Sequence, residues 1–328
     1  MEIQDKVELC FPQLLNSSCR SPTLHWSEAV LLNIVLSFIS FITVVLNLLV
    51  IISVSHFRKL HTPTNILLLS LAVSDFLVGL LLMPGEIFRN TACWILGDIM
   101  CALYCYLVCH IVSASIGGIV LISVDRYVAI CHPLHYSTRI TLAGVKNCVC
   151  LCWLGAAFYS IIYVRDVLIQ PGRSNSCIGE CTFSISYITG TVDLVLNFVF
   201  PVIVIVVLYM RIFVVAVSQV RAMRSQITVV ALHHKVTSSK KSELKAARTL
   251  GVLVVVYLLC FCPYYSYSLF EVNVTSTTYA SFLVFLFYFN SCLNPIIYAF
   301  FYPWFRKAIK FIVTLQILQP GSCETNMM

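Results

Sequence analysis

Seven long apolar stretches run through this chain of 328 residues, and they constrain its fold more than any other feature. A helix needs about 20 apolar residues to cross a bilayer, and these stretches cover residues 29–54, 62–87, 98–131, 143–166, 185–215, 245–270 and 279–301. The chain is 59% hydrophobic and only 11% charged, whereas soluble domains are about a quarter charged. The sequence therefore predicts an all-α membrane protein built as a seven-transmembrane helix bundle.

The stretches divide the chain into an N-terminal segment (1–28), a seven-helix domain (29–301) and a C-terminal segment (302–328). Positive charge is uneven: of 21 Lys and Arg residues, the N-terminal side of the membrane carries only Lys6, Arg20, Arg89, Arg165 and Arg173. Because cytoplasmic loops hold the positive excess, we expect a multi-pass plasma-membrane protein with an extracellular N-terminus. Residues 303–311 alternate apolar and basic side chains at helical spacing, which is typical of a short amphipathic helix on the membrane surface.

Six of the 16 cysteines fall in the segments expected outside. They are Cys10, Cys19, Cys93, Cys101, Cys177 and Cys181. An even number in an oxidising compartment indicates three disulfides, and the residues alone leave 15 pairings open. Sequons at Asn16 and Asn273 fall on the same side and predict N-glycosylation there.

Polar side chains interrupt the spans at positions that can meet inside the bundle. They are Asn47, Asp75, Ser115, Asn290, Ser291 and Asn294. Two interpretations are about equal: a sodium or proton site coupled to helix movement, or an interhelical hydrogen-bond network that only holds helices together. Asp193 lies inside the fifth span. A charge in hydrocarbon costs roughly 2.5–3.5 kcal/mol, so this carboxylate indicates a partner or a wet cavity.

The third span ends in Asp125-Arg126-Tyr127, and the sixth begins near Glu243. Arg126 can pair with Asp125 or, across the inner end of the bundle, with Glu243. A pair that forms in one state only would be a switch, and the alternative is a fixed pair that anchors helix ends.

Prolines at 201, 263 and 295 bend the last three spans. Aromatic residues gather around them at Phe261, Tyr264, Tyr265 and Tyr288. These rings either pack in the core or form the wall of a cavity, and an aromatic wall attracts cations.

Taken in order, these features resemble the rhodopsin-like G-protein-coupled receptors. The matching residues are Asn47, 71–75, 125–127, Trp153, Pro201 with Tyr209, 260–263 and 294–298. The resemblance implies that Arg126 and Tyr209 face a G protein, and that Tyr298, after Asn294-Pro295, moves on activation. It also implies that the Asp75 pocket, with Ser115, Asn290, Ser291 and Asn294, holds sodium. We expect no other cofactor.

Narrower features resemble the trace amine-associated receptors: residues 290–308, the pair Cys10 and Cys19 with a sequon before Cys19, and Cys177 four residues before Cys181. The resemblance implies olfactory or trace-amine sensing, a stimulatory G protein and cyclic AMP. It also implies the bridge from Cys101 to a cysteine of the second outer loop. We predict the pairs Cys101–Cys181, Cys10–Cys177 and Cys19–Cys93.

The chain departs from the usual amine-receptor pattern at two important positions. The aspartate expected 17 residues before Asp125 is Val108, while Asp193 lies eight residues before Pro201, as in a branch of fish receptors. The usual tryptophan two residues before the sixth-span proline is Phe261.

We therefore predict that a small ammonium ligand pairs with Asp193. The predicted lining is Asn197, Val108, Cys109, Val112, Phe261, Tyr264, Tyr265 and Tyr288. Glu86 is equally consistent with contacting a second ammonium and with being a surface-facing or loop-paired acid. The alternatives are a receptor for neutral odorants and, more remotely, a transporter or channel. The sequence contains neither a nucleophile–base pair nor a spaced set of metal ligands, so we expect neither an enzyme nor a metal site besides the sodium pocket at Asp75, and no nucleic-acid partner.

Overall fold

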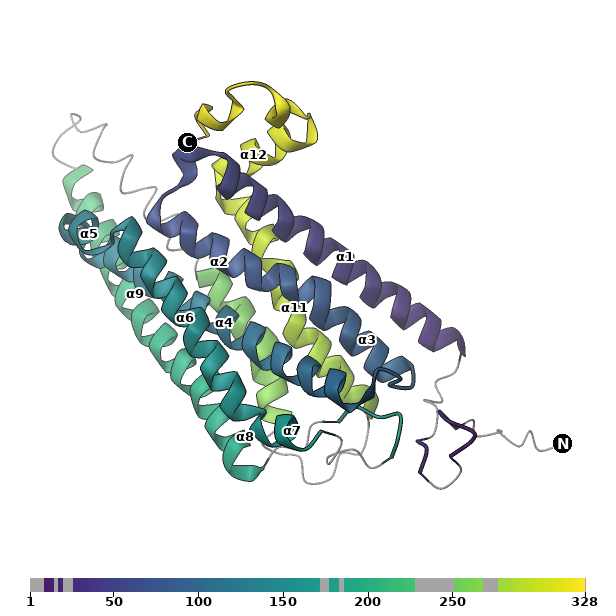
Figure 1. The fold of residues 1–328 in the computed structure, drawn as a ribbon. Coiled ribbons are helices and arrows are strands. Elements are labelled where there is room, and N and C mark those ends of the chain that lie inside the picture. Colours follow the sequence, from purple (N-terminus) through teal and green to yellow (C-terminus); the bar gives the residue numbers. More distant parts are fainter. Residues whose placement is uncertain are drawn as a thin grey trace.

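The computed structural model describes residues 9–14, 17–19, 26–171, 177–182, 186–227, 251–267 and 277–327, which form a bundle of helices (Figure 1). Six of the described helical spans are long and apolar enough to cross a membrane. The shorter apolar helix Gly251–Tyr267 lies where the sequence predicts the sixth span. The predicted all-α bundle is therefore confirmed.

The helices follow the predicted order. They are α1 (Trp26–His56), α2 (Pro63–Leu77), α3 (Met83–Thr91), α4 (Gly97–Cys131), α6 (Leu142–Tyr163), α8 (Tyr187–Leu194), α9 (Phe200–Ile227), Gly251–Tyr267 and α11 (Thr277–Phe301). The connections contain the 3₁₀ turn Arg58–Leu60 and the short helices α5 (Pro133–Arg139) and α7 (Arg165–Ile169). The second and fifth spans are each two α-helices joined by a π-helical segment, Val78–Leu82 and Val195–Val199 respectively.

A proline lies just beyond each π-helical segment, at Pro84 and Pro201. Proline has no N–H, so a carbonyl in the preceding turn is left for another donor. In the second span, Ser40 Oγ of α1 donates to Gly79 O at 2.7 Å. The extra residue in a π turn rotates the side chains beyond it relative to a continuous α-helix. Proline and π turn together thus set the orientation of α3.

The distribution of buried and exposed side chains is the opposite of that in a soluble protein. The polar residues predicted for the interior, Asn47, Asp75, Ser115, Asn290, Ser291 and Asn294, are all no more than 5% exposed. In contrast, Leu151, Leu154 and Phe158 on α6 are each more than 60% exposed. Apolar side chains outside and hydrogen-bonded polar groups inside are what a bilayer favours.

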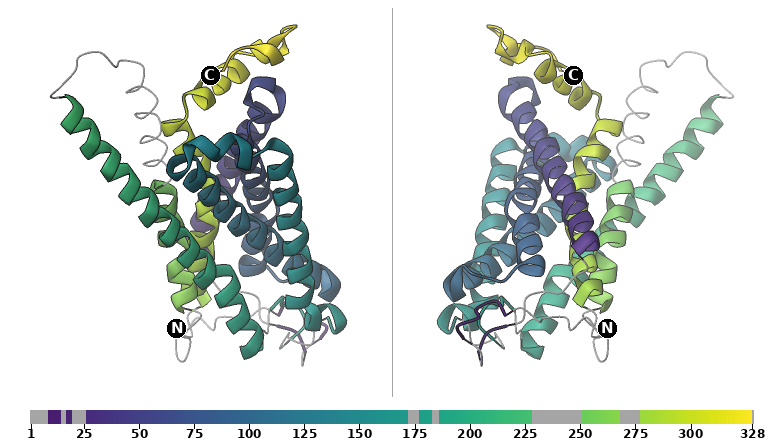
Figure 2. Two further views of the ribbon diagram at one scale, coloured as in Figure 1. Left: turned by 90° about the vertical axis from the view of Figure 1, so that its left-hand side faces the viewer. Right: turned by 90° about the vertical axis from the view of Figure 1, so that its right-hand side faces the viewer.

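The predicted amphipathic helix is α12 (Pro303–Val313), which turns away from the axis of α11 (Figure 1). It buries Trp304, Phe305 and Ala308 and exposes Arg306 and Lys307. The 3₁₀ turns Gln316–Leu318 and Ser322–Glu324 follow. We call this the α12 end of the bundle and the opposite end, with three disulfides, the disulfide end. Toward the α12 end, α9 leans away from the other helices (Figure 2).

Candidate functional site

Asp193 lies on α8 in the disulfide half of the bundle and is partly buried. Its Oδ1 accepts two hydrogen bonds, from Tyr159 Oη at 2.7 Å and from Asn197 Nδ2 at 2.7 Å. No described residue donates to Oδ2, and no described Lys or Arg forms an ion pair with this carboxylate. The structure thus presents an acid that is oriented by neutral donors and has an acceptor atom to spare.

Asn197 connects Asp193 to the sixth span. It lies in the π-helical segment, and its own carbonyl would bond to the residue at 201 in a regular helix, but that residue is proline. The Tyr257 hydroxyl, which is fully buried, lies 3.5 Å from this carbonyl. The side chain of Asn197 therefore binds the carboxylate, while its backbone carbonyl contacts the helix Gly251–Tyr267.

An aromatic wall, defined here as Phe198, Phe261, Tyr264, Tyr265, Phe287 and Tyr288, lies beside this site. Phe198 stacks on Tyr265 with ring centroids 4.6 Å apart, and Phe261 and Phe287 are 4.2 Å apart. Tyr264 and Tyr265 both lie within electrostatic range of Asp193. The predicted aromatic residues are thus brought together, and Phe198 and Phe287 extend the predicted set.

The residues of α4 that were predicted to line the site carry no charge. Val108, Cys109 and Val112 are partly buried and pack against the core. Cys109 lies within electrostatic range of Asp193, and Val112 and Phe261 line a small cavity with room for about one water molecule. Val108, where the usual aspartate was expected, therefore provides no counter-ion on α4.

Glu86 on α3 is buried, with a side chain that is only 3% exposed. Arg89, one turn further along α3, forms an ion pair with it, with Nη2 2.5 Å from Oε1. Arg89 Nη1 also lies 3.3 Å from the carbonyl oxygen of Cys181 in the loop between α7 and α8. Of the two alternatives, these contacts are those of a loop-paired acid, since Arg89 connects Glu86 to this loop.

Asp75 is the centre of the predicted polar pocket. Asn294 Nδ2 donates to its Oδ2 at 2.8 Å, and Ser115 Oγ to its Oδ1 at 3.4 Å. Asn47 Nδ2 donates to the carbonyl of Ser291 at 3.0 Å. The buried Asn290 Oδ1 has no hydrogen-bond donor among the described residues. Asn290 and Ser291 also line the small cavity beside Phe261, so this pocket adjoins the aromatic wall.

At the α12 end, Arg126 pairs with the neighbouring Asp125 through Nη2 at 2.5 Å. Thr64 and Tyr136 also donate to Asp125, each at 2.9 Å, and Thr64 additionally accepts from Arg126. Glu243 lies outside the described residues. The structure therefore shows the local Asp125 pair, and the pair across the inner end stays a prediction.

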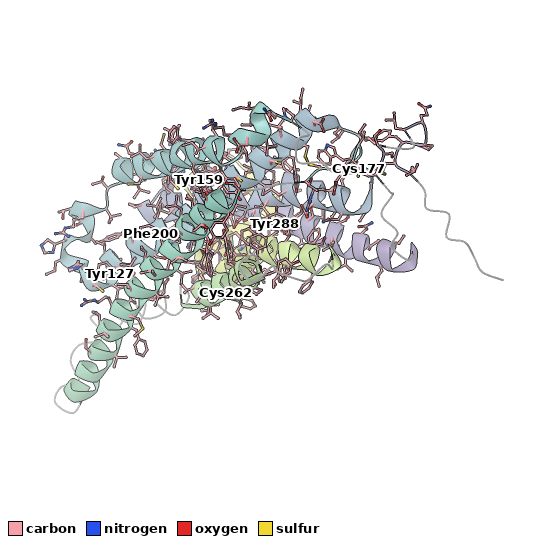
Figure 3. All side chains as sticks on the ribbon, turned by 90° about the horizontal axis from the view of Figure 1, so that it is seen from below. Tyr127, Tyr159, Cys177, Phe200, Cys262 and Tyr288 are labelled. Carbon is pink, nitrogen blue, oxygen red and sulfur yellow. A yellow bond between two sulfur atoms is a disulfide. The ribbon has the colours of Figure 1, made fainter. Side chains whose placement is uncertain are left out.

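Three further residues predicted to act in activation lie in this half of the molecule. Tyr127 packs edge-on against His132, and Tyr209 lies within electrostatic range of Arg126. Tyr298 follows Pro295 in α11 and is fully buried, and its hydroxyl has no partner among the described residues. Along the bundle, Tyr159 and Tyr288 lie between Tyr127 and Cys177 (Figure 3).

The disulfide end contains three bridges: Cys101–Cys181, Cys10–Cys93 and Cys19–Cys177. The first confirms the prediction, but the predicted pairs Cys10–Cys177 and Cys19–Cys93 are wrong.

Backbone pairing explains this correction. Ile178 N donates to Ser17 O at 2.7 Å and Cys19 N donates to Ile178 O at 2.9 Å, which places Cys19 beside Cys177. Trp94 N donates to Gly179 O at 2.9 Å, and Gly179 lies against Cys10. Cys10 therefore faces Cys93. This register depends on contacts between distant segments. The acceptor residues of the two sequons, Asn16 and Asn273, lie outside the described residues.

Two residues near the site were missed by the sequence analysis. Tyr159 is one of 16 tyrosines in an apolar chain, and nothing local distinguishes it. Arg89 could have been found, since it lies three residues after Glu86 in a helical span, and that spacing places two side chains on one face.

Comparison with known proteins agrees with this arrangement. The family described as 7 transmembrane receptor (rhodopsin family) matches residues 46–298. Trace amine-associated receptor 13c of Danio rerio is 40% identical over 98% of this chain and 97% of its own length. Trace amine-associated receptors 7e of Mus musculus and 7a of Rattus norvegicus are each 37% identical over 98% of this chain and 92% of theirs.

Proposed function

From the premise that this chain belongs to the rhodopsin family of 7 transmembrane receptors, and within it to the trace amine-associated receptors, we propose that it recognises a small organic amine through Asp193. The protein is a multi-pass plasma-membrane receptor coupled to a heterotrimeric G protein, and not an enzyme. The proposal concerns its ligand, its site and its signalling.

The observation that carries the proposal is the incomplete pairing of Asp193. Buried charges need a counter-charge and hydrogen bonds, yet this carboxylate has two neutral donors and no described cation. An ammonium group supplies both missing elements, a positive charge and N–H donors for Oδ2. Charge-assisted bonds of this kind are roughly twice as strong as neutral ones.

The surroundings suit the rest of such a ligand. Tyr264 and Tyr265 present aromatic rings near the carboxylate, and ring faces attract cations. Tyr288 continues the same aromatic wall through Phe287. Val108, Cys109 and Val112 would contact the hydrocarbon part, with Phe261 below. The ammonium would thus lie on the wall formed by α8 rather than on α4.

For signalling, the proposal places the N-terminus and the disulfide end outside the cell. Three observations support this orientation: most basic residues belong to the sequence segments after the first, third, fifth and seventh spans, α12 is amphipathic, and disulfides form in oxidising compartments. Arg126, Tyr209 and Tyr298 would then respond to ligand and face a stimulatory G protein that raises cyclic AMP. Odorant sensing is the corresponding physiological role.

The Asp75 pocket is the proposed site of a sodium ion. Its oxygens are a carboxylate, the Ser115 hydroxyl and the unpartnered amide oxygen of Asn290, all of the hard type that such a cation favours. The neighbouring cavity has room for about one water molecule. A bound cation would neutralise Asp75 and connect α2, α4 and α11.

The test is a cyclic AMP assay of cells expressing the receptor, with mono- and diamines beside neutral analogues of the same shape. Responses to amines but not to analogues that lack the ammonium are expected. Equal responses to neutral analogues would replace this proposal with a receptor for neutral odorants. A ligand-driven ionic current without G protein would indicate a channel.

A further inference from the structure

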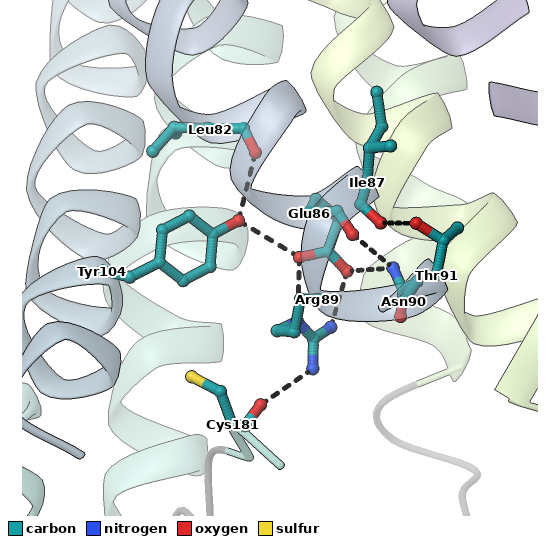
Figure 4. Close-up of polar contacts among 8 residues, drawn as sticks. All are labelled: Leu82, Glu86, Ile87, Arg89, Asn90, Thr91, Tyr104 and Cys181. Carbon is teal, nitrogen blue, oxygen red and sulfur yellow. Dashed lines mark hydrogen bonds and ion pairs between the residues drawn. The ribbon is translucent and has the colours of Figure 1, made fainter. Parts of the chain in front are cut away.

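An ion pair between Arg89 and Glu86 lies in α3, in the second span (Figure 4). Arg89 contacts both oxygens of Glu86, through Nη2 at 2.5 Å and through Nε at 3.1 Å. The Glu86 side chain is only 3% exposed, whereas that of Arg89 is 23% exposed. The carboxylate is therefore neutralised by its own helix, and the partly exposed member of the pair is the cation.

The pair is held rigidly by its neighbours. Asn90 Nδ2 donates to Glu86 Oε1 at 2.9 Å, and the Tyr104 hydroxyl lies 3.2 Å from Oε2. Arg89 donates to the carbonyl of Cys181, and the disulfide to Cys101 fixes that residue against α4. Moving the guanidinium away from Glu86 would break contacts to two elements at once.

Electrostatics connects this pair to the proposed amine site. The rings of Tyr264 and Tyr288 both contact Phe287, with centroids 5.1 and 5.9 Å apart respectively. Tyr264 interacts electrostatically with Asp193, and both tyrosines interact with Glu86 and Arg89. The aromatic wall therefore extends from the surroundings of Asp193 to those of Glu86. Asp193 has no described cation beside it, whereas Glu86 has Arg89.

We propose that Arg89 is a specificity-determining residue that makes this receptor selective for amines with one positive charge, which deepens the proposed function and rests on it. An ammonium bound at Asp193 finds a free negative charge. A second ammonium at the other end of the ligand meets a guanidinium and a carboxylate that is already paired, so it is repelled and left desolvated. A hydroxyl or ether oxygen at that end can instead accept a hydrogen bond from Arg89.

The experiment compares three ligands of matched chain length: an alkylamine, the corresponding α,ω-diamine and the amino alcohol. It uses the full-length receptor, Arg89→Gln and the control Arg165→Gln, an exposed basic residue of α7 at the same end of the bundle. Responses are normalised to surface expression. Wild type and Arg165→Gln should prefer the monoamine and the amino alcohol. Arg89→Gln should shift the ratio of potencies toward the diamine by at least about tenfold, because close charge pairs couple strongly.

Removing Arg89 leaves Glu86 buried without its cation, and such variants often fold poorly. The double variant Glu86→Gln/Arg89→Gln keeps the shape without either charge and should lose most of the discrimination against the diamine. An unchanged ratio in whichever variant reaches the surface would overturn the inference, as would a wild type that prefers the diamine. Failure of the proposed function is a different result, since wild type would then respond to no amine or would respond equally to the neutral analogues.

Discussion

Tyr159 Oη lies 2.7 Å from Oδ1 of Asp193, so the fourth span orients the acid that the fifth span provides. The hydroxyl and the Asn197 amide share this one oxygen, and Oδ2 receives no hydrogen bond from any described residue. The free oxygen is thus held in a defined direction before any ligand arrives. Such pre-organisation reduces the entropy lost on binding.

Asp193→Asn should lower amine potency by at least tens-fold while surface expression holds. The variant keeps the shape and removes the charge, and loss of one partner of a desolvated pair costs roughly 2–5 kcal/mol. That range corresponds to about 30-fold to several-thousandfold in affinity. Concentration–response curves measure it, and Asp193→Glu is the charge-retaining control. A wild-type response of Asp193→Asn to amines would refute the proposed pairing.

Val108→Asp in the Asp193→Asn background should restore a response to amines with altered ligand preference. The new carboxylate would lie on α4, so the ammonium would bind to the opposite wall of the site. The readout is the rank order of potency over the amine panel. The same rank order as wild type would mean that the two positions are not alternative anchors.

Tyr159→Phe should lower amine potency by up to about tenfold, because a hydrogen bond to an ionised group is worth roughly 1.5–3 kcal/mol and only part of it differs between free and bound states. Tyr163→Phe is the matched control. Tyr163 packs against Tyr159 with ring centroids 5.7 Å apart, and no hydrogen bond from it to Asp193 is seen. Equal effects of the two substitutions would show that the Tyr159 bond has no specific role.

The N-terminal bridges should map as Cys10–Cys93 and Cys19–Cys177 in peptides from non-reduced receptor. Surface expression gives an independent test, because substitutions that remove two bonded partners are not additive. Surface expression of the double variant Cys10→Ser/Cys93→Ser should be no lower than that of either single variant. Surface expression of Cys10→Ser/Cys177→Ser should be lower than that of both single variants. Peptides that join Cys10 to Cys177 would contradict this assignment.

Glu243→Ala should raise basal cyclic AMP if Glu243 holds Arg126 in the inactive state. The acid lies outside the described residues, and the described partner of Arg126 is Asp125. Lys241→Ala, a nearby change of opposite charge, should not raise it. Unchanged basal signalling of Glu243→Ala at equal surface expression would leave Asp125 as the functional partner.

Much of the site could be predicted from local sequence. Asp193 was identified because a charge within an apolar span is costly, and Asn197 because it lies four residues further along the same span. The buried group around Asp75 was identified for the same reason. The π turns could not be predicted, although Pro84 and Pro201 indicate where the regular hydrogen bonding fails.

The sequence by itself determined the seven-helix architecture, since long apolar runs must satisfy their backbone groups internally when no water is present. It also indicated which polar residues of the spans would be buried inside the bundle. Tertiary structure alone decided which side chains meet: Tyr159 with Asp193, Arg89 with the Cys181 carbonyl, and Cys10 with Cys93 rather than Cys177. These partners lie on different elements, so their pairing depends on the packing and register of distant segments, which no local pattern encodes.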